Sequence, residues 1–471
     1  MSKALGLAIA AALLAGCTVG PAHVRPTLSL PSEFDQASSA QTAAAPGTEV
    51  WKAFKDPALD TLIARTLVAN TTLAQAEARL AETRALSGLS LYALFPTVTA
   101  GAGASRSKPS TQDPFIPPDQ GQTDTYRAGF DASWEIDLFG GLRNASRAIR
   151  ARAEANAAEV RSAQLSVVGE TAQTYFALRG AQRRLALAKE NLAAAAEATK
   201  LITLLAQNGR LNGVDTARAQ SQRDTLAAAL PQREAELVAQ EQRLAVLTAQ
   251  PVADVREQVG EVAAFPELPE LVTAGTPEEW LKRRPDITAA ERRLAAANND
   301  VGKEMAQFFP KLVLNGVFGW TGQAASALGS SSAERWEWGP SLSWRFLDFG
   351  RVRQTMKAAE ARANGSEAAY RETVLRALEE TENALAGYRA SNRAATSLVS
   401  AANAAGEAAR LGRLRFKAGA DSALTLIQTE QTRIDLEDAA VQAQTSRTTS
   451  LAALYKAVAG DFAESAARED G

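Results

Sequence analysis

Apolar and polar residues alternate without exception across residues 125–138. Every even position is apolar and every odd position is polar or Gly, which is the period of a β-strand with one face in an apolar medium and one in a polar medium. Residues 336–346 carry a similar alternation, rich in Trp and Phe. Shorter segments of the same kind, 97–106 and 311–320, precede them, and each has about the 9 to 11 residues that a tilted strand needs to cross a bilayer. The pattern predicts two β-hairpins.

Proline is absent from residues 119–230 and 341–471, although the chain has 18 prolines. Proline costs about 3 kcal/mol inside a helix, so long stretches of Ala, Glu, Arg, Gln and Leu without it indicate long helices. We expect helices at 141–207 and 351–417, each about 100 Å long at about 1.5 Å per residue.

Short turns rich in Gly, Asn and Asp end both long helices, at 208–213 and 418–421. Return helices are expected from about 214 to 249 and from about 422 to 458. These helices alone fit an ordinary coiled-coil rod, with seams of 3 and 4 spacing. The alternating strands argue against a rod.

The chain contains an internal duplication. The motif at 76–80 and Phe95-Pro96 return 214 residues later, and Ser133-Trp134, Phe139-Gly140 and Gly209 return 210 residues later. Agreement at so many positions indicates a tandem repeat of roughly 200 residues, with one loop of different length.

The duplication sets the expected domain organisation. The first repeat, 51–275, holds helices, a hairpin at about 97–138, the first long helix with its turn and return helix, and a belt at mid-height. The second, 276–460, holds a hairpin at about 311–348 and the second long helix, turn and return helix. Residues 461–471 form a C-terminal tail.

The first 16 residues have the layout of a secretory signal peptide, since Lys3 precedes a short apolar run that ends in small residues. Cys17 follows in Leu-Ala-Gly-Cys, which looks like a bacterial lipobox, so we expect an acylated Cys17 to become the first mature residue. A plain signal peptide with an incidental Cys is the alternative. Residues 17–50 are expected to form an extended, lipidated tether. No later run is apolar and long enough for a transmembrane helix.

The supply of reactive groups limits the possible chemistry. His23 and Cys17 are the only His and Cys in the chain, which argues against Ser-His-Asp or Cys-His catalysis, a His/Cys metal site and an internal disulfide. Asp131, Glu135 and Asp137 share one face of a strand but spread over about 20 Å, with no converging partner. We therefore expect no enzyme, no cofactor and no metal. A formal net charge of −2 gives no reason to expect a nucleic-acid partner.

One chain supplies four membrane strands, and an open four-stranded sheet leaves edge N–H and C=O groups unsatisfied in lipid. Three chains sharing one barrel would supply twelve strands, within the range known for outer-membrane barrels. The chain is therefore expected to be a homotrimer in contact with outer-membrane lipid. A water-soluble sandwich also alternates, and it is the alternative at this point.

Several motifs together resemble the outer-membrane factor family, the trimeric ducts of tripartite efflux pumps, in its NodT-type lipoprotein branch. They are the lipobox, Trp51-Lys-Ala-Phe-Lys-Asp-Pro57, Arg283-Arg-Pro-Asp-Ile287, Phe308-Phe-Pro-Lys-Leu312, and Gly339-Pro-Ser-Leu-Ser-Trp344 with Asp348-Phe-Gly-Arg351. The resemblance implies a mixed membrane α+β fold, a trimeric 12-stranded transmembrane β-barrel continuous with a long periplasmic 12-helix α-barrel. It also implies a periplasmic adaptor protein and an inner-membrane pump of the RND type as partners.

Family members close the pore just beyond the turn of the second repeat. The matching positions are Phe416, Lys417, Asp421, Leu424 and Gln428. Asp421, Leu424 and Gln428 lie at i, i+3 and i+7 on one helical stripe, which three-fold symmetry would turn into rings. For Asp215, after the first turn, two interpretations are open, an ion pair with Lys417 or a helix cap.

The turns themselves are the expected contacts with the adaptor. These residues are Asn208, Gly209 and Arg210 in the first turn and Ala418, Gly419 and Ala420 in the second. The expected function is an outer-membrane channel that passively conducts small toxic compounds or drugs from the periplasm to the outside, anchored through Cys17, with a large periplasmic portion. The alternatives are a duct for type I protein secretion and a structural envelope lipoprotein.

Overall fold

The computed structural model describes residues 18–36, 50–110, 112, 121–262, 265–266, 268 and 276–458. The expected signal peptide, Cys17 and the expected C-terminal tail at 461–471 lie outside the described residues. The chain forms two compact units, one built from residues 1–27, 79–157 and 289–371 and the other from 28–78, 158–288 and 372–471. Each unit draws on both sequence repeats, whose boundaries stay a prediction.

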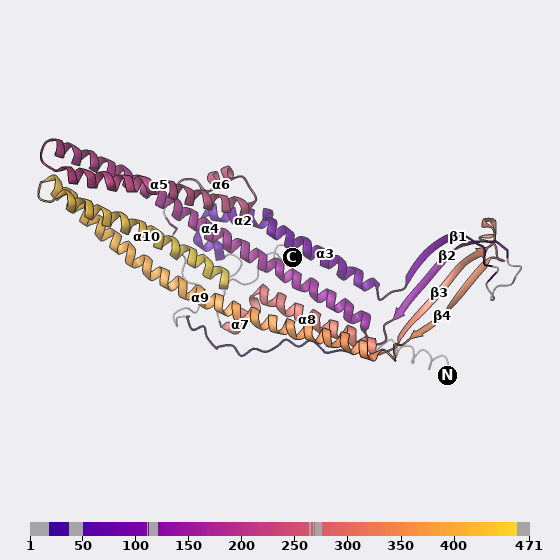
Figure 1. The fold of residues 1–471 in the computed structure, drawn as a ribbon. Coiled ribbons are helices and arrows are strands. Elements are labelled where there is room, and N and C mark those ends of the chain that lie inside the picture. Colours follow the sequence, from indigo (N-terminus) through magenta and orange to yellow (C-terminus); the bar gives the residue numbers. More distant parts are fainter. Residues whose placement is uncertain are drawn as a thin grey trace. The chain divides into compact units, whose positions relative to one another are not determined.

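Helices and strands follow the order that the sequence pattern predicts (Figure 1). They are η1 (Val50–Phe54), α2 (Pro57–Ala69), α3 (Thr71–Tyr92), β1 (Thr97–Ser107), β2 (Thr123–Ile136), α4 (Gly141–Gln207), α5 (Gly213–Thr248), α6 (Val252–Val259), α7 (Pro277–Arg283), α8 (Pro285–Met305), η2 (Ala306–Phe308), β3 (Lys311–Gly322), η3 (Ala325–Ala327), β4 (Glu334–Ser343), α9 (Phe349–Lys417) and α10 (Ala423–Val458).

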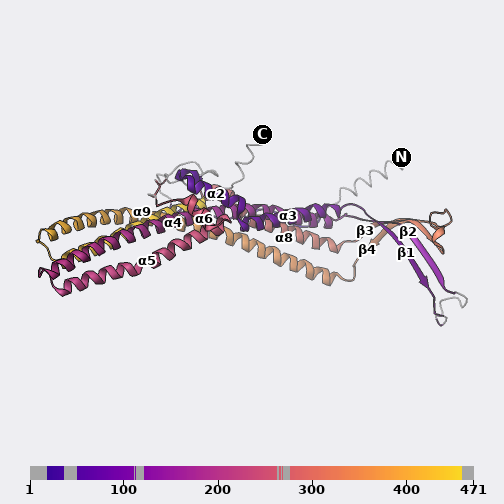
Figure 2. The same ribbon diagram turned by 90° about the horizontal axis from the view of Figure 1, so that it is seen from above.

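The four strands of the first unit form one antiparallel sheet in the order β1-β2-β3-β4 (Figures 1 and 2). Phe130 of β2 lies between Ala100 of β1 and Phe318 of β3 in the register. The β2–β3 pairing joins the hairpins of the two repeats. In the described chain, β1 and β4 each pair on one side only, so the sheet has two open edges.

The register places the alternating residues on two opposite faces, as predicted. Phe318 pairs with Trp336 and Gly316 with Trp338, so the apolar residues of neighbouring strands share a face. Trp336 and Trp338 are 67% and 72% exposed. A broad, exposed aromatic face of this kind suits contact with lipid.

Two strands end earlier than expected. β2 ends at Ile136 and β4 at Ser343, so Trp344 lies just beyond its strand. The indole N–H of Trp344 donates to the carbonyl of Phe308 at 3.0 Å, and that of Trp134 donates to the carbonyl of Leu94 at 2.9 Å. Both acceptors stand directly before a Phe-Pro pair, so the two repeats anchor their hairpins in the same way.

In the second unit, α4 contacts α10 through residues spaced eleven apart. These are Gly169, Gly180, Asn191 and Ile202, and all four are buried. Eleven residues make about three helical turns, so this spacing keeps one face toward the partner. A Cβ added at Gly180 would lie 2.9 Å from the Cβ of Thr445, which shows how closely the two helices approach.

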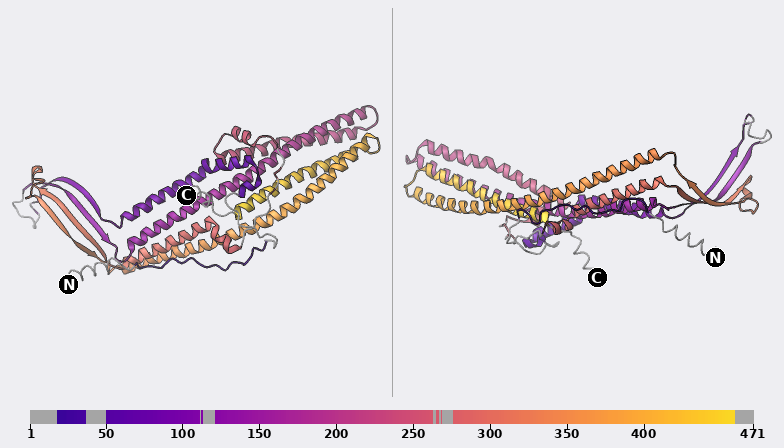
Figure 3. Two further views of the ribbon diagram at one scale, coloured as in Figure 1. Left: turned by 180° about the vertical axis from the view of Figure 1, so that it is seen from behind. Right: turned by 90° about the horizontal axis from the view of Figure 1, so that it is seen from below.

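Aromatic residues fill the core of the second unit. The ring of Phe54 lies 4.8 Å from that of Phe176 and 5.5 Å from that of Tyr455, measured between centroids. The indole N–H of Trp280 donates to the carbonyl of Ala457 at 3.0 Å, which ties α7 to the end of α10. The short helices α2 and α6 lie beside α5 (Figures 1 and 3).

Residues 18–36, the described part of the expected tether, are extended and pack on the rest of the chain. In the first unit, Nε2 of His23 lies 2.6 Å from Oε1 of Glu291, and both side chains are largely buried. In the second unit, Phe34 packs edge to face on Trp280.

Candidate functional site

The turns that end α4 and α9, at the tips of the two helical hairpins, have matching backbone hydrogen bonds. In the first turn the N–H groups of Asn208, Gly209 and Arg210 donate to the carbonyls of Leu204, Ala206 and Leu205 at 3.2, 3.0 and 2.8 Å. In the second turn those of Ala418, Gly419 and Ala420 donate to Leu414, Phe416 and Arg415 at 3.0, 2.9 and 2.9 Å. The central Gly has a φ of +71° in one turn and +74° in the other, a conformation that favours glycine.

The return helices also begin alike. The side chain of Asn212 accepts from the N–H of Asp215 at 3.1 Å, and that of Ser422 accepts from the N–H of Thr425 at 3.1 Å. Asp215 completes the cap by accepting from the N–H of Asn212 at 3.4 Å. Of the two interpretations of Asp215, the structure therefore shows the helix cap.

All six residues predicted to contact an adaptor are exposed at these turns. They are Asn208, Gly209, Arg210, Ala418, Gly419 and Ala420. Exposed backbone at a helix tip is accessible to a partner, but exposure alone does not identify one. Their role stays a prediction.

A small apolar cluster, which we name the tip cluster, holds the two hairpins together. Its buried members are Ile202, Ala219, Phe416, Ala423 and Leu426, one or two from each of α4, α5, α9 and α10. Leu205, Leu211 and Ile427 pack against it. The hairpin tips, which lie side by side in Figures 1 and 2, therefore share a core.

Phe416 belongs to this core and not to an exposed gate surface. Its side chain is only 8% exposed, so it packs the hairpin tips together, and its place in the gate stays a prediction. The prediction rested on position alone, and the burial of Phe416 depends on Ile202 and Ala219, which come from the other hairpin.

Asp421 forms an ion pair with Arg415 across the second turn. Nε and a terminal nitrogen of Arg415 donate to the two carboxylate oxygens at 2.8 and 3.1 Å. These hydrogen bonds, against the opposing effect of desolvation and helped by the charge of Arg415, hold the pKa of Asp421 below its ordinary value. Arg415 was not among the predicted residues, because no spacing rule connects it to Asp421.

Leu424 and Gln428 follow on α10, as the predicted stripe requires. Leu424 is 37% exposed although it is a large apolar residue, and Gln428 is exposed as well. Lys417 is exposed at the end of α9. The tip of the second hairpin thus presents an ion pair, a lysine and an apolar side chain close together.

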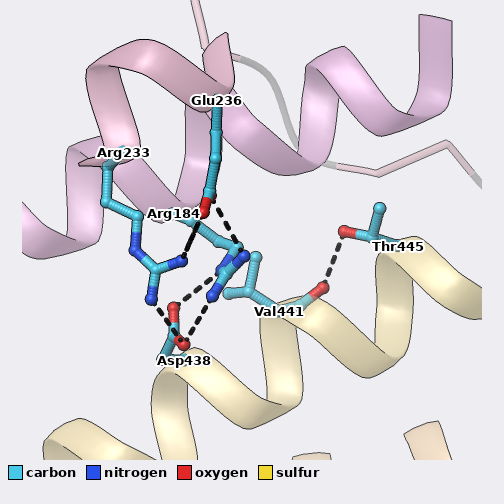
Figure 4. A network of polar contacts seen from close by, with 6 residues as sticks. All are labelled: Arg184, Arg233, Glu236, Asp438, Val441 and Thr445. Atoms are coloured by element: carbon cyan, nitrogen blue, oxygen red, sulfur yellow. Dashed lines mark hydrogen bonds and ion pairs between the residues drawn. The ribbon is translucent and has the colours of Figure 1, made fainter. Parts of the chain in front are cut away.

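A network of four charged residues links three helices behind the tips (Figure 4). Arg184 of α4 donates to both oxygens of Asp438 on α10 at 2.8 and 2.9 Å, and Arg233 of α5 donates to Asp438 at 3.1 Å. Glu236 lies within 3.4 Å of Arg184 and 3.2 Å of Arg233. Burial opposes ionisation of Asp438, but the hydrogen bonds of Arg184 and the two positive charges hold its pKa below the ordinary value.

A second polar cluster lies nearer the tips. Arg433 of α10 donates to the side chain of Asn191 on α4 at 2.9 Å and to Glu430 at 2.9 Å. Glu430 also lies 3.0 Å from Arg413 of α9. An ion pair thus joins α9 to α10, and a hydrogen bond joins α10 to α4, where the tip cluster ends. Sequence spacing does not reveal these contacts.

The described residues lack two features. They contain no group of three or more His, Cys, Asp or Glu side chains that could hold a metal ion. Within that same part of the chain, no helix is long and apolar enough to cross a membrane.

Comparison with known proteins gives consistent results over most of the chain. The family model described as "Outer membrane efflux protein" matches residues 62–250 and 276–460. The outer membrane protein OprJ of Pseudomonas aeruginosa is 29% identical over 96% of this chain and 94% of its own length. The antibiotic efflux pump outer membrane protein ArpC of Pseudomonas putida is 28% identical over 98% of this chain and 97% of its own. The structure of the outer-membrane channel OprN superposes with a TM-score of 0.89 at 35% identity, covering 95% of this chain and all of that one.

Proposed function

Since this chain belongs to the outer membrane efflux protein family, we propose that it is the outer-membrane duct of a tripartite efflux pump. The predicted fold class is confirmed by the likeness to an outer-membrane channel over nearly the whole chain. In this proposal the duct passively conducts small toxic compounds or drugs, as the names of its relatives suggest. It has no catalytic role.

The observation that carries this proposal is the sheet with two open edges. β1 and β4 pair on one side only within the described chain, and an open edge in lipid leaves backbone groups unsatisfied. Pairing β4 of one copy with β1 of the next satisfies both edges. Three copies give a closed barrel of twelve strands, with the Trp-rich face toward lipid and the polar face around the lumen.

The partners follow from the pump architecture. An inner-membrane pump, of the RND type, would deliver the compounds, and a periplasmic adaptor would bind the exposed turns at Gly209 and Gly419. An acyl chain on Cys17 would add a lipid anchor to the barrel. Mass spectrometry of the mature protein tests the anchor, and an unmodified Cys17 would rule it out.

The gate is proposed at the second tip, where Leu424 and the Arg415–Asp421 pair lie. Three copies of an apolar side chain around an axis form a constriction that resists wetting, and charges beside it select among ions.

Two measurements on the full-length protein test the duct. Detergent-solubilised protein should sediment as a trimer, and the same preparation should conduct ions across a planar bilayer. A monodisperse monomer with full β content, or a trimer without conductance, contradicts the proposal.

A further inference from the structure

A cavity of about 320 Å³ opens in the first unit where the strands end and α4 begins. We call it the junction cavity. Its walls include two aromatic rings and five charged side chains, which are Phe139, Phe309, Glu135, Asp137, Lys303, Lys311 and Arg345. The volume is at the lower end of the range usual for small-molecule sites.

Two stacked aromatic rings lie in one wall. The rings of Phe139 and Phe309 stack with centroids 4.5 Å apart and an angle of 16° between their planes. The two residues are not equivalent positions of the two repeats, because Phe139 follows β2 and Phe309 precedes β3. Their stack offers a further ring a large apolar contact with little loss of side-chain freedom.

The two acidic residues of the cavity are already neutralised by cations. Asp137 accepts from the backbone N–H groups of Leu142 and Arg143 at 3.2 and 2.8 Å, so it caps α4, and the Arg143 side chain pairs with it at 3.2 Å. Glu135 lies 3.4 Å from the Nζ atom of Lys311. Neither carboxylate leaves an uncompensated negative charge.

The remaining charge of the cavity is positive. No residue in the described part of the chain forms an ion pair with Arg345. Lys303 lies 3.5 Å from Glu304, a long contact with an acid that also accepts from Gln307. The cavity therefore combines a stacked aromatic pair with an excess of positive charge.

We propose that the junction cavity binds an aromatic organic anion, with its ring against Phe139 and Phe309 and its carboxylate at Arg345 and Lys303. An Arg guanidinium suits this role because it binds carboxylates with two hydrogen bonds. Glu135 and Lys311 lie on the polar face of the sheet, so the ligand would bind on the lumen side. The assignment deepens the proposed function by naming a substrate class, and it rests on that function for the lumen.

Calorimetric titration of 2-naphthoate into the detergent-solubilised full-length trimer tests this site. Wild-type protein should bind it, and Arg345→Gln should weaken binding about tenfold, because a hydrogen-bonded charge is lost. Lys303→Gln should weaken it less. Arg335→Gln is the matched control, because Arg335 lies in β4 on the polar face of the sheet but outside the cavity. This variant should bind 2-naphthoate with the affinity of wild type.

Two comparison ligands separate the contribution of the aromatic ring to binding from that of the negative charge. The neutral 2-naphthylmethanol and inorganic phosphate should each bind far more weakly than 2-naphthoate. Equal binding of 2-naphthoate to wild type, Arg345→Gln and Lys303→Gln would overturn the proposal, as would a phosphate affinity equal to that of 2-naphthoate. Conductance of the wild-type trimer in a bilayer is measured separately, so loss of the duct function and loss of this site give different results.

Discussion

Arg415 and Asp421 join the two sides of the second helix turn by a pair of hydrogen bonds of 2.8 and 3.1 Å. The corresponding positions of the first turn, 210 residues earlier, hold Leu205 and Leu211, which pack against the tip cluster. Two turns of the same backbone geometry thus carry an ion pair in one case and apolar side chains in the other. The asymmetry places fixed charge at the second hairpin, where the gate is proposed.

Asp421→Ala should shift the ion selectivity of the channel toward anions. The substitution removes one negative charge per chain and leaves the Arg415 guanidinium without its carboxylate. In the narrow pore of the proposed gate, water and salt would screen this change only weakly. The reversal potential in a salt gradient measures the change. Glu407→Ala, which breaks a comparable exposed pair with Arg410 on α9, should leave the reversal potential unchanged. A wild-type value for Asp421→Ala would place the pair outside the conduction path.

Wild-type selectivity should respond to acid only at low pH. The pKa of Asp421 is held below its ordinary value, so the ion pair is fully formed at neutral pH and is lost only as the pH falls through that lowered pKa. We expect a constant reversal potential from pH 7 to about 5, and a shift toward anions only at pH values below the ordinary Asp pKa of about 4. A shift that is complete by pH 6 would contradict the assignment to Asp421.

Asp438→Asn should loosen the contact of α10 with α4 and α5. Arg184 and Arg233 would each lose a charged partner, while the shape of the side chain is kept. A double-mutant cycle of Asp438→Asn with Arg184→Gln should give a coupling of about 1 to 2 kcal/mol, measured as the thermal stability of the trimer. Additive effects of the two substitutions would show that the Arg184–Asp438 pair in Figure 4 contributes nothing to the stability of the trimer.

Gly180→Ala and Gly387→Ala should change stability in opposite directions. A Cβ at Gly180 would collide with Thr445 of α10, whereas one at Gly387 on α9 meets no atom of the described chain within 4 Å. Overpacking costs about 1 to 3 kcal/mol, while Ala stabilises an open helical site by up to about 1 kcal/mol relative to Gly. Helix melting followed by circular dichroism tests both. Equal melting temperatures for the two variants would show that α4 and α10 are not in close contact.

The sequence predicts the regular elements well because their physical signals are local. Alternation over residues 125–138 requires a two-faced strand, and the observed register confirms the faces. The first long helix is found at the predicted Gly141–Gln207, because the turn after it begins with Asn208 and Gly209.

The contacts at the tips depend on residues far apart in the chain, and no local signal reports them. Phe416 is buried by Ile202 and Ala219, about 200 residues away. The bond between Arg433 and Asn191 likewise joins two different helices. Position alone identified the region of the proposed gate, but it could not separate core residues from exposed ones.

Phe416→Ala is the comparison variant for Leu424→Ala in a test of the gate. It deletes a buried ring from the tip cluster, so it should destabilise the tips by about 3 kcal/mol. Any rise in conductance would then come with earlier melting of the helices. Leu424→Ala removes a half-exposed side chain, and it should leave the melting temperature close to that of wild type.

Leu424→Ala should raise single-channel conductance in planar bilayers and admit bulky antibiotics into cells. Each chain contributes one Leu424, and three shortened side chains around an axis widen an apolar constriction and make it easier to wet. Leu342→Ala is the matched control, because Leu342 is an equally apolar residue on the exposed apolar face of β4, where it would meet lipid. Conductance and antibiotic susceptibility at wild-type levels in a correctly assembled Leu424→Ala trimer would mean that the constriction lies at other residues, and that the charges beside Leu424 do not border the pore.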